Sequence, residues 1–193
     1  MPKPTRLAPA ARRAQLIDVA SRLCADRHVG TVGIGEVADA AGVSRSLVYA
    51  YFGDRGGLLA AMYLHNLDQL NLELDRFLGD RLEAVQLRQI IRRYLMFARD
   101  NLAAWNVMAA AGTLQHPAIV AARRERIERI AGVWGSDPTA RLVAGGVVGL
   151  LEAGAQDWVD HPEVGLERTT EVLFAVLWEG LTGLRRHGFV AVS

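Results

Sequence analysis

The side chains best suited to chemistry on a partner molecule lie on one face of a short helix that begins after Ser44. Leu47 and Val48 point toward a core, which leaves polar and small side chains on the opposite face. A guanidinium binds a guanine edge or a phosphate, a tyrosine hydroxyl reaches phosphate oxygens, and small side chains let a helix lie deep in a groove. The outward-facing set is Arg45, Ser46, Tyr49, Ala50 and Tyr51. It predicts contact with the major groove of duplex DNA, and the alternative is a helical hairpin with ordinary solvated polar residues.

The elements that must position this face are two short helices joined by a glycine turn, the arrangement of a helix-turn-helix. Apolar residues of the first helix recur at i, i+3, i+4 and i+7: Ile34, Val37, Ala38 and Ala41. Gly42 supplies the positive φ of the turn, and Ser44 caps the second helix. Gly33 lies at the cap position of the first helix but has no side-chain oxygen to accept a free N–H.

A third helix is expected to follow at once. Phe52 closes the second helix against the core, Gly53 breaks it, and Asp54 caps a long helix with Arg55 in its first turn. Free N–H groups and a cation at that helix start suit a phosphate. We therefore add Arg55, Gly33 and Ser44 to the predicted DNA contacts.

Residues from about Arg12 to Tyr63 resemble the DNA-binding domain of the tetracycline-repressor (TetR) family. The resemblance is carried by EVADAAGVS, by Tyr49 and Phe52 in LVYAYFGDR, and by the basic Arg55 three positions later. It implies a dimeric transcriptional regulator that pairs through its last two long helices and senses a small molecule in its C-terminal half.

Three positions depart from the family pattern. Gly33 replaces a hydroxyl residue that touches a phosphate, so that contact is in doubt. Cys24 replaces a Phe, which implies a locally smaller core. His28 replaces the Gly that, in the family, ends the helix before the helix-turn-helix, expected here at about 10–27.

The charge distribution agrees with a DNA-binding N-terminal part. The chain carries only +1 overall, but residues 1–57 hold eight Lys and Arg against five Asp and Glu, a balance of +3, which leaves −2 for the rest. A basic N-terminal part on a mildly acidic body attracts phosphates without strong non-specific binding. Random segregation of a few charges is the alternative.

The remainder of the chain predicts helices only. Helical stretches are expected at about 10–27, 54–78, 82–101, 103–111, 117–134, 139–160 and 166–187, with Gly and Pro breakers between several of them. The fold class is therefore all-α, a three-helix helix-turn-helix domain followed by a helical ligand-binding and dimerisation domain. The expected divisions are a flexible basic arm at 1–9, the DNA-binding domain at 10–56, and the effector-binding and dimerisation domain at 57–193.

The charged run from Arg123 to Arg129 offers Arg124/Glu128 and Glu125/Arg129 as i, i+4 pairs. Such pairs are typical of a solvated helix face, and we expect one here.

The last two long helices carry the predicted homodimer surface. Small residues every four positions allow a partner helix to come close, and an apolar stripe follows on the final helix, so the two helices could form half of a four-helix bundle. The alternative is packing within the chain. The predicted interface residues are Gly145, Gly149, Ala153, Leu173, Val176, Leu177, Leu181 and Leu184.

Aromatic, Met and Asn residues of the middle helices are the candidates for an effector pocket. Such walls suit a small apolar molecule, although each residue is equally compatible with plain core packing. The set is Met62, Asn66, Tyr94, Phe97, Trp105, Met108 and Trp158.

Catalysis finds little support in the sequence. The five histidines are scattered without metal-ligand spacing, no glycine-rich phosphate loop follows a strand, and Cys24 lies on a core face. We expect no enzyme activity, no catalytic or metal-binding residues and no cofactor. A single cysteine without a signal peptide indicates a cytoplasmic protein, and the longest charge-free apolar run, 142–151, is too short to cross a membrane.

The predicted function is a sequence-specific, homodimeric DNA-binding regulator, most simply a repressor released from a palindromic operator by a small apolar effector. The competing hypothesis is a helical protein that binds an apolar ligand and does not read DNA.

Overall fold

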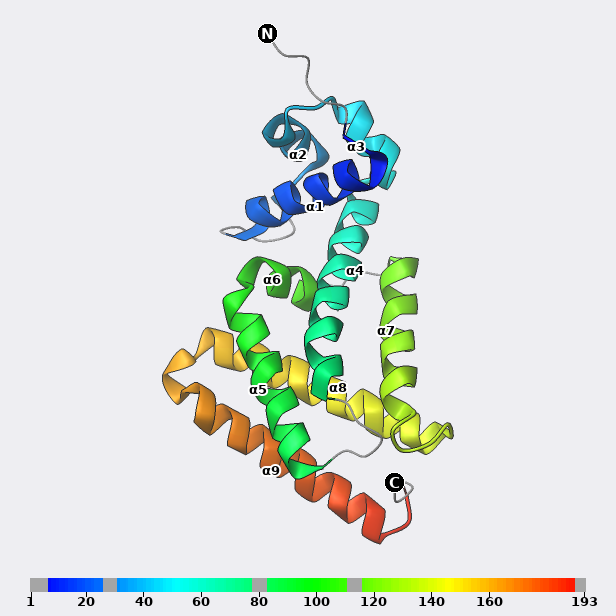
Figure 1. Ribbon diagram of the computed structural model, residues 1–193, viewed down its shortest axis with the longest axis vertical. Coiled ribbons are helices and arrows are strands. Elements are labelled where there is room, and N and C mark those ends of the chain that lie inside the picture. Colours follow the sequence, from blue (N-terminus) through cyan, green and yellow to red (C-terminus); the bar gives the residue numbers. More distant parts are fainter. Residues whose placement is uncertain (1–6, 26–30, 78–82, 111–115, 190–193) are drawn as a thin grey trace. The chain divides into compact units, whose positions relative to one another are not determined.

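The computed structural model describes residues 7–25, 31–77, 83–110 and 116–189, and its described secondary structure is helical throughout (Figure 1). This confirms the predicted all-α class. The long elements are α1 (Pro9–Ala25), α2 (Ile34–Ala41), α3 (Arg45–Phe52), α4 (Arg55–Leu74), α5 (Ala84–Asp100), α6 (Leu102–Ala110), α7 (Pro117–Ala131), α8 (Pro138–Asp160) and α9 (Leu166–Arg186). Two 3₁₀ turns follow α4 and α8, namely η2 (Asp75–Phe77) and η3 (Pro162–Val164).

The chain divides into two compact units. Unit 1 comprises residues 1–66 and 102–116, and unit 2 comprises residues 67–101 and 117–193. The continuous helix α4 therefore contributes residues to both. These units are defined by which residues pack together. The expected boundary at 56/57 instead separates the part that binds DNA from the part that binds the effector. The packing units do not test it, and it stays a prediction.

Unit 1 holds α1, α2, α3, the first part of α4, and α6. Its core is formed by fully buried apolar side chains that come from each of the three N-terminal helices and from α4: Leu16, Ala20, Val37, Ala38, Val48 and Leu58. Helix α6 packs on α1, and the buried amide of Asn66 donates a hydrogen bond of 3.4 Å to the carbonyl of Ala104 in α6. Within unit 1, α2 and α3 are thus supported by α1, α4 and α6.

Unit 2 is built from α5, α7, α8 and α9 with the end of α4. Helix α5 packs against both α8 and α9, and α7 packs against α8 (Figure 1). Helices α8 and α9 come close where α8 has Gly154, because a Cβ at that position would lie 2.6 Å from a methyl group of Leu173. This glycine was not among the small residues singled out by their four-residue spacing.

The helix bounds follow the sequence prediction closely, and the largest difference is at the end of α4. Helix α4 ends at Leu74 and continues as the 3₁₀ turn η2, rather than running to residue 78. Gly and Pro breakers were expected at residues 79–80 and 112–117, and of these 79–80 and 112–115 lie outside the described residues, as does His28.

The expected solvated face between Arg123 and Arg129 is wrong for its central residue. Arg126 is only 6% exposed, and its Nη1 donates to Glu152 Oε1 of α8 at 3.3 Å. The partner on another helix, not a residue four positions away, determines where this side chain lies.

No helix in the described ranges is long and apolar enough to span a membrane.

Candidate functional site

The turn between α2 and α3 has the geometry that the sequence predicts. Gly42 adopts φ +65°, ψ +36°, the left-handed conformation that glycine tolerates without a Cβ clash. The Ser44 hydroxyl then accepts the Leu47 N–H at 3.3 Å and lies 3.0 Å from the Ser46 hydroxyl. Both the turn and the start of α3 are therefore fixed by local interactions.

The start of α2 is held despite its glycine cap. Glu36 Oε2 accepts the backbone N–H of Gly33 at 3.0 Å, so a carboxylate one turn into the helix satisfies a donor at the cap. Gly33 itself is half-buried. The hydroxyl that would touch a phosphate is missing, but the helix end is not left without a partner.

Helix α3 has one buried and one exposed face. Val48 and Phe52 are buried, and Leu47 is half-buried. Of the predicted DNA contacts on and before this helix, Ser44, Arg45, Ser46, Tyr49 and Ala50 are exposed, and Tyr49 keeps 51% of its surface accessible. Tyr51 is half-buried with its ring tilted against Phe52 at 6.2 Å between centroids, so it presents less surface than the rest.

Arg45 lies across the neighbouring helix α2. A Cβ built on Gly35 would lie 3.1 Å from the Cζ, Nε and Nη2 atoms of its guanidinium. The missing side chain at position 35 therefore leaves the space in which the exposed cation rests. The sequence analysis assigns no role to Gly35, and only the structure shows how close it lies to Arg45.

The junction of α3 and α4 is tightly built. Gly53 has φ +76°, and Asp54 Oδ1 accepts the Gly57 N–H at 2.7 Å, as predicted for a cap. Gly57 is close to the end of α3, because a Cβ there would lie 1.9 Å from the carbonyl oxygen of Phe52. This approach fixes where the exposed face of α3 ends.

Arg55, the predicted phosphate contact, also holds unit 1 together. Its Nε donates to the carbonyl of Val32 at 3.0 Å, which ties the start of α4 to the segment before α2. The side chain is exposed overall. Arg55 thus stabilises the start of α4 through a hydrogen bond and also places a positive charge on the exposed surface of unit 1.

Two further side chains of unit 1, Arg13 and Cys24, interact with groups near the helix-turn-helix. The guanidinium of Arg13 lies 5.5 Å from the ring centroid of Phe52, a cation–π contact that braces the end of α3. Burial raises the pKa of the Cys24 thiol, partly opposed by the nearby Arg55 cation, so the thiol stays protonated at neutral pH.

The predicted effector residues are all buried but fall into different units. Met62, Asn66, Trp105 and Met108 belong to unit 1, whereas Tyr94, Phe97 and Trp158 belong to unit 2. The Arg99 guanidinium covers the Trp158 ring at 5.6 Å. Of the seven, Tyr94 lines the cavity described next.

A cavity of about 90 Å³ lies inside unit 2, between the end of α4 and helices α5, α7 and α8. We call it the α7 cavity. Its wall is mostly apolar, and it includes Leu87, Ile90, Tyr94, Arg126, Trp134 and Leu151. Trp134 is 2% exposed, and its indole Nε1 has no hydrogen-bond acceptor among the described residues.

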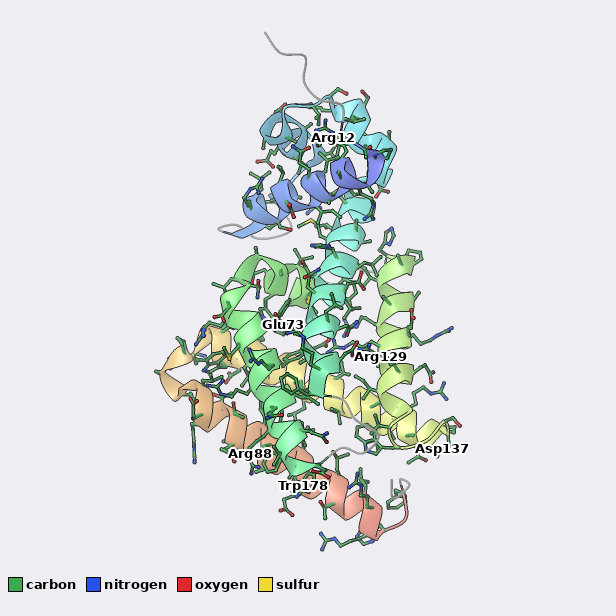
Figure 2. The ribbon with its side chains drawn as sticks, viewed as in Figure 1. Arg12, Glu73, Arg88, Arg129, Asp137 and Trp178 are labelled. Carbon is green, nitrogen blue, oxygen red and sulfur yellow. The ribbon has the colours of Figure 1, made fainter. Side chains whose placement is uncertain are left out.

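Charged groups surround one side of the α7 cavity. Glu152 accepts hydrogen bonds from Arg126 at 3.3 Å and from Arg123 at 3.1 Å, so one carboxylate serves two guanidiniums. Arg129, labelled in Figure 2, extends to Asn71 Oδ1 at 2.7 Å and to Asp75 Oδ1 at 3.2 Å. The sequence shows the charged run from Arg123 to Arg129 but gives no signal for its partners Asn71, Asp75 and Glu152, which lie far from it along the chain.

The predicted dimer residues divide between surface and core. Gly149, Ala153 and Val176 are exposed, whereas Gly145 and Leu184 are half-buried. Leu173, Leu177 and Leu181 are buried within the chain. Other small or apolar residues extend the exposed surface of the two helices: Leu142, Gly146, Val172, Ala175 and Gly180.

Comparison with known proteins gives a consistent result over most of the chain. The family model of bacterial regulatory proteins of the tetR family matches residues 16–62, and that of the tetracyclin repressor-like C-terminal domain matches residues 84–180. A TetR-like transcriptional regulator from Rhodococcus sp. RHA1 superposes with a TM-score of 0.70 and 26% identity, covering 92% of this chain and 100% of that one.

Sequence relatives agree. An uncharacterised HTH-type transcriptional regulator of Mycobacterium tuberculosis strain H37Rv is 37% identical over 103 residues, 49% of this chain and 51% of the relative. The chain thus spans about half the length of curated relatives that it matches. The transcriptional activator FasR of Mycolicibacterium smegmatis is 24% identical over 184 residues, 89% of this chain and 83% of FasR.

The C-terminal model alone covers about half of the chain, and the N-terminal model covers the helix-turn-helix. The chain therefore belongs to the tetR family of bacterial regulatory proteins.

Proposed function

We propose that the chain is a homodimeric transcriptional repressor that binds a palindromic operator through α3 and releases it when a small molecule binds in unit 2. The observation that carries the DNA-binding part is the division of α3, whose apolar face is buried while Arg45, Ser46 and Tyr49 are exposed. A short helix fixed at both ends and polar on its free side suits the major groove.

The two halves of the operator follow from the proposed dimer. The exposed surface of α8 and α9 is rich in Gly, Ala and Val, which allows helices of two copies to approach closely. A two-fold dimer presents two copies of α3 related by symmetry, so it reads an inverted repeat. Leu173, Leu177 and Leu181 support this surface from within, since they pack inside the chain.

Effector release is proposed to act through α4. This helix is continuous, and Asn71 and Leu74 near its end line the α7 cavity. A ligand that prefers the conformation unable to bind DNA weakens operator binding, and the operator must weaken ligand binding by the same factor. Equal ligand affinity of the free and operator-bound protein would exclude this mechanism.

The test of DNA reading is selection of bound sequences from a random duplex pool at physiological salt. The proposal predicts an enriched inverted repeat for the wild type and loss of enrichment for Arg45→Ala/Tyr49→Ala. A matched control is Arg168→Ala, which removes an exposed cation from α9. An unenriched pool for the wild type would favour the competing hypothesis of a ligand-binding protein that does not read DNA.

The direction of regulation needs its own measurement, since the relative FasR is named an activator. A reporter gene placed behind the selected sequence should fall in expression when the chain is supplied. A rise would show an activator.

A further inference from the structure

The start of α1 places an exposed cation, Arg13, at the end of α3. We infer that Arg13 is a further DNA contact, which binds a backbone phosphate beside the turn between α3 and α4. This inference rests on the proposed function, because it requires α3 to lie in the major groove. It adds a phosphate contact from a helix outside the helix-turn-helix.

The first support is the position of the Arg13 side chain. Its guanidinium lies 5.5 Å from the ring centroid of Phe52, the last residue of α3. Figure 1 shows the dark-blue start of α1 beside that end of α3. Gly53 then turns the chain with φ +76°, and Arg55 begins α4. Two cations from different helices therefore border the same turn.

The length of α3 explains why this end meets the DNA backbone. Its eight residues span about 12 Å, which matches the roughly 12 Å width of the major groove. In a helix-turn-helix, the N-terminal residues of the recognition helix contact the base edges, and here these are Arg45 and its neighbours. The opposite end of α3 then approaches the sugar–phosphate backbone, and the Arg13 guanidinium lies at that end.

The second support is the environment of the Arg13 charge. Its contact in the described part of the chain is the cation–π contact with Phe52, and no described carboxylate forms an ion pair with it. Its neighbour Arg12 differs, because Arg12 Nη1 donates to Gln15 Oε1 at 2.5 Å. A ring contact holds the flat face of a guanidinium and leaves the N–H groups at its edge able to bind phosphate oxygens. Arg13 thus offers a phosphate both a positive charge and hydrogen-bond donors.

The turn itself carries one acidic residue, Asp54, which has a local role. Its Oδ1 accepts the Gly57 N–H at 2.7 Å and caps α4. Arg13 and Arg55 outnumber this single carboxylate, so the charge balance at the turn favours an anion.

The third support is that Arg13 is held in place before DNA arrives. The Phe52 ring is only 8% exposed, and Leu16 and Ile17, about one turn later on α1, are buried. Packing therefore fixes both the ring and the helix that carries Arg13. A side chain positioned in advance loses less conformational entropy when it binds.

The experiment measures the affinity of the full chain for operator and scrambled duplexes between about 50 and 200 mM salt. Each phosphate neutralised by a cation contributes about 0.9 to the slope of log affinity against log salt concentration. Arg13→Met keeps an unbranched apolar side chain over Phe52 but removes the charge. We expect the slope to fall by about 1 for each copy of the chain on the duplex, with operator and scrambled duplexes alike. The operator-to-scrambled affinity ratio should stay within about twofold, because phosphates carry no sequence information.

The matched control is Arg22→Met. Arg22 is an exposed arginine of the same helix, but it lies in the last turn of α1 rather than near the start. Its replacement changes the net charge by the same amount and should leave the slope at the wild-type value.

A purely structural role of Arg13 predicts a different pattern. Loss of a brace on Phe52 would misplace α3, so the melting temperature and the operator-to-scrambled ratio would fall while the slope for scrambled duplex stayed unchanged. That pattern, or equal slopes for Arg13→Met and Arg22→Met, would overturn the inference. Arg13→Gln is measured in parallel, so that a folding defect of one variant does not end the test, and Arg13→Lys should restore the slope because it keeps the charge.

Failure of the proposed function gives another result. A wild type that binds no duplex at any of these salt concentrations would overturn both the proposed function and this inference. A wild type that prefers its operator, with Arg13→Met at the wild-type slope, would leave the proposed function intact and exclude only the phosphate contact.

Discussion

The exposed face of α3 and the inner face of α7 both depend on an arginine, but the two arginines are in opposite environments. Arg45 is exposed and rests over Gly35, available to a partner that arrives from outside. Arg126 is 6% exposed and paired with Glu152 beside a cavity. The same type of side chain is thus exposed to solvent on one helix and held in a buried ion pair on another, and packing decides which.

The comparison also separates what is local from what is not. The environment of Arg45 follows from residues within about ten positions, because the Gly42 turn and the Ser44 cap orient α3. The environment of Arg126 depends on Glu152, which is 26 residues later in the sequence. The following predictions change one region at a time, from the largest expected effect to the smallest.

Gly57→Ala should disrupt the region around α3 most strongly. Its Cβ would lie 1.9 Å from the Phe52 carbonyl oxygen, so the backbone must move, and we expect a loss of about 3 kcal/mol in stability together with operator binding. Chemical denaturation of the wild type and of Gly57→Ala measures the loss of stability, and a binding titration measures the loss of operator affinity. Gly56→Ala is the neighbouring control, since its Cβ would meet only side-chain atoms at 3.1 Å or more; equal losses from the two would show that the close approach is unimportant.

Arg45→Ala should remove about 1–3 kcal/mol of discrimination between the operator and other duplexes, because a guanidinium on a guanine edge contributes that much. Arg55→Ala should weaken all duplexes alike and also lower stability by about 1 kcal/mol, since its bond to the Val32 carbonyl is lost. Binding titrations with operator and scrambled duplexes distinguish them. If both variants lost the same affinity for operator and scrambled duplexes, Arg45 would contact only phosphate.

Asp137 should give α8 a measurable pH dependence. Its carboxylate accepts the N–H groups of Thr139 and Ala140 at the start of α8 (Figure 2), and these bonds hold the pKa of Asp137 below its ordinary value of 3.8. The stabilisation is present above that value and is lost as the pH falls through the lowered pKa. Asp137→Asn keeps the cap but should show less loss of melting temperature in acid; identical acid profiles would contradict this.

Gly35→Ala should have the smallest effect and the opposite sign. Alanine inside α2 favours the helix by up to about 1 kcal/mol, while the Arg45 guanidinium needs to move by only a few tenths of an ångström. We expect higher stability and operator discrimination within about threefold of the wild type. Loss of discrimination comparable to Arg45→Ala would show that the resting position of Arg45 over Gly35 is essential.

Much of the fold is predictable from the sequence because caps and breakers act locally. The starts of α2 and α3, the left-handed Gly42 and the Asp54 cap were all expected from single residues and their spacing. The early end of α4 was not, since no Gly or Pro marks Leu74.

The candidate sites divide in the same way. The exposed face of α3 is predictable from helical periodicity, whereas the α7 cavity gathers residues of α4, α5, α7 and α8 that share no pattern in sequence. The stripe of Leu173, Leu177 and Leu181 shows a related limit. Periodicity identifies an apolar face, but it does not say whether the chain itself or a second copy covers that face.

The measurement that tests the central claim most directly is the ratio of operator to scrambled-duplex affinity, determined by competition at physiological salt for the wild type and for Arg45→Ala/Tyr49→Ala. The account predicts a ratio of about 10³ or more for the wild type, which falls at least about tenfold in the variant while scrambled-duplex affinity changes less. An unchanged ratio in a folded variant would contradict DNA reading by the exposed face of α3.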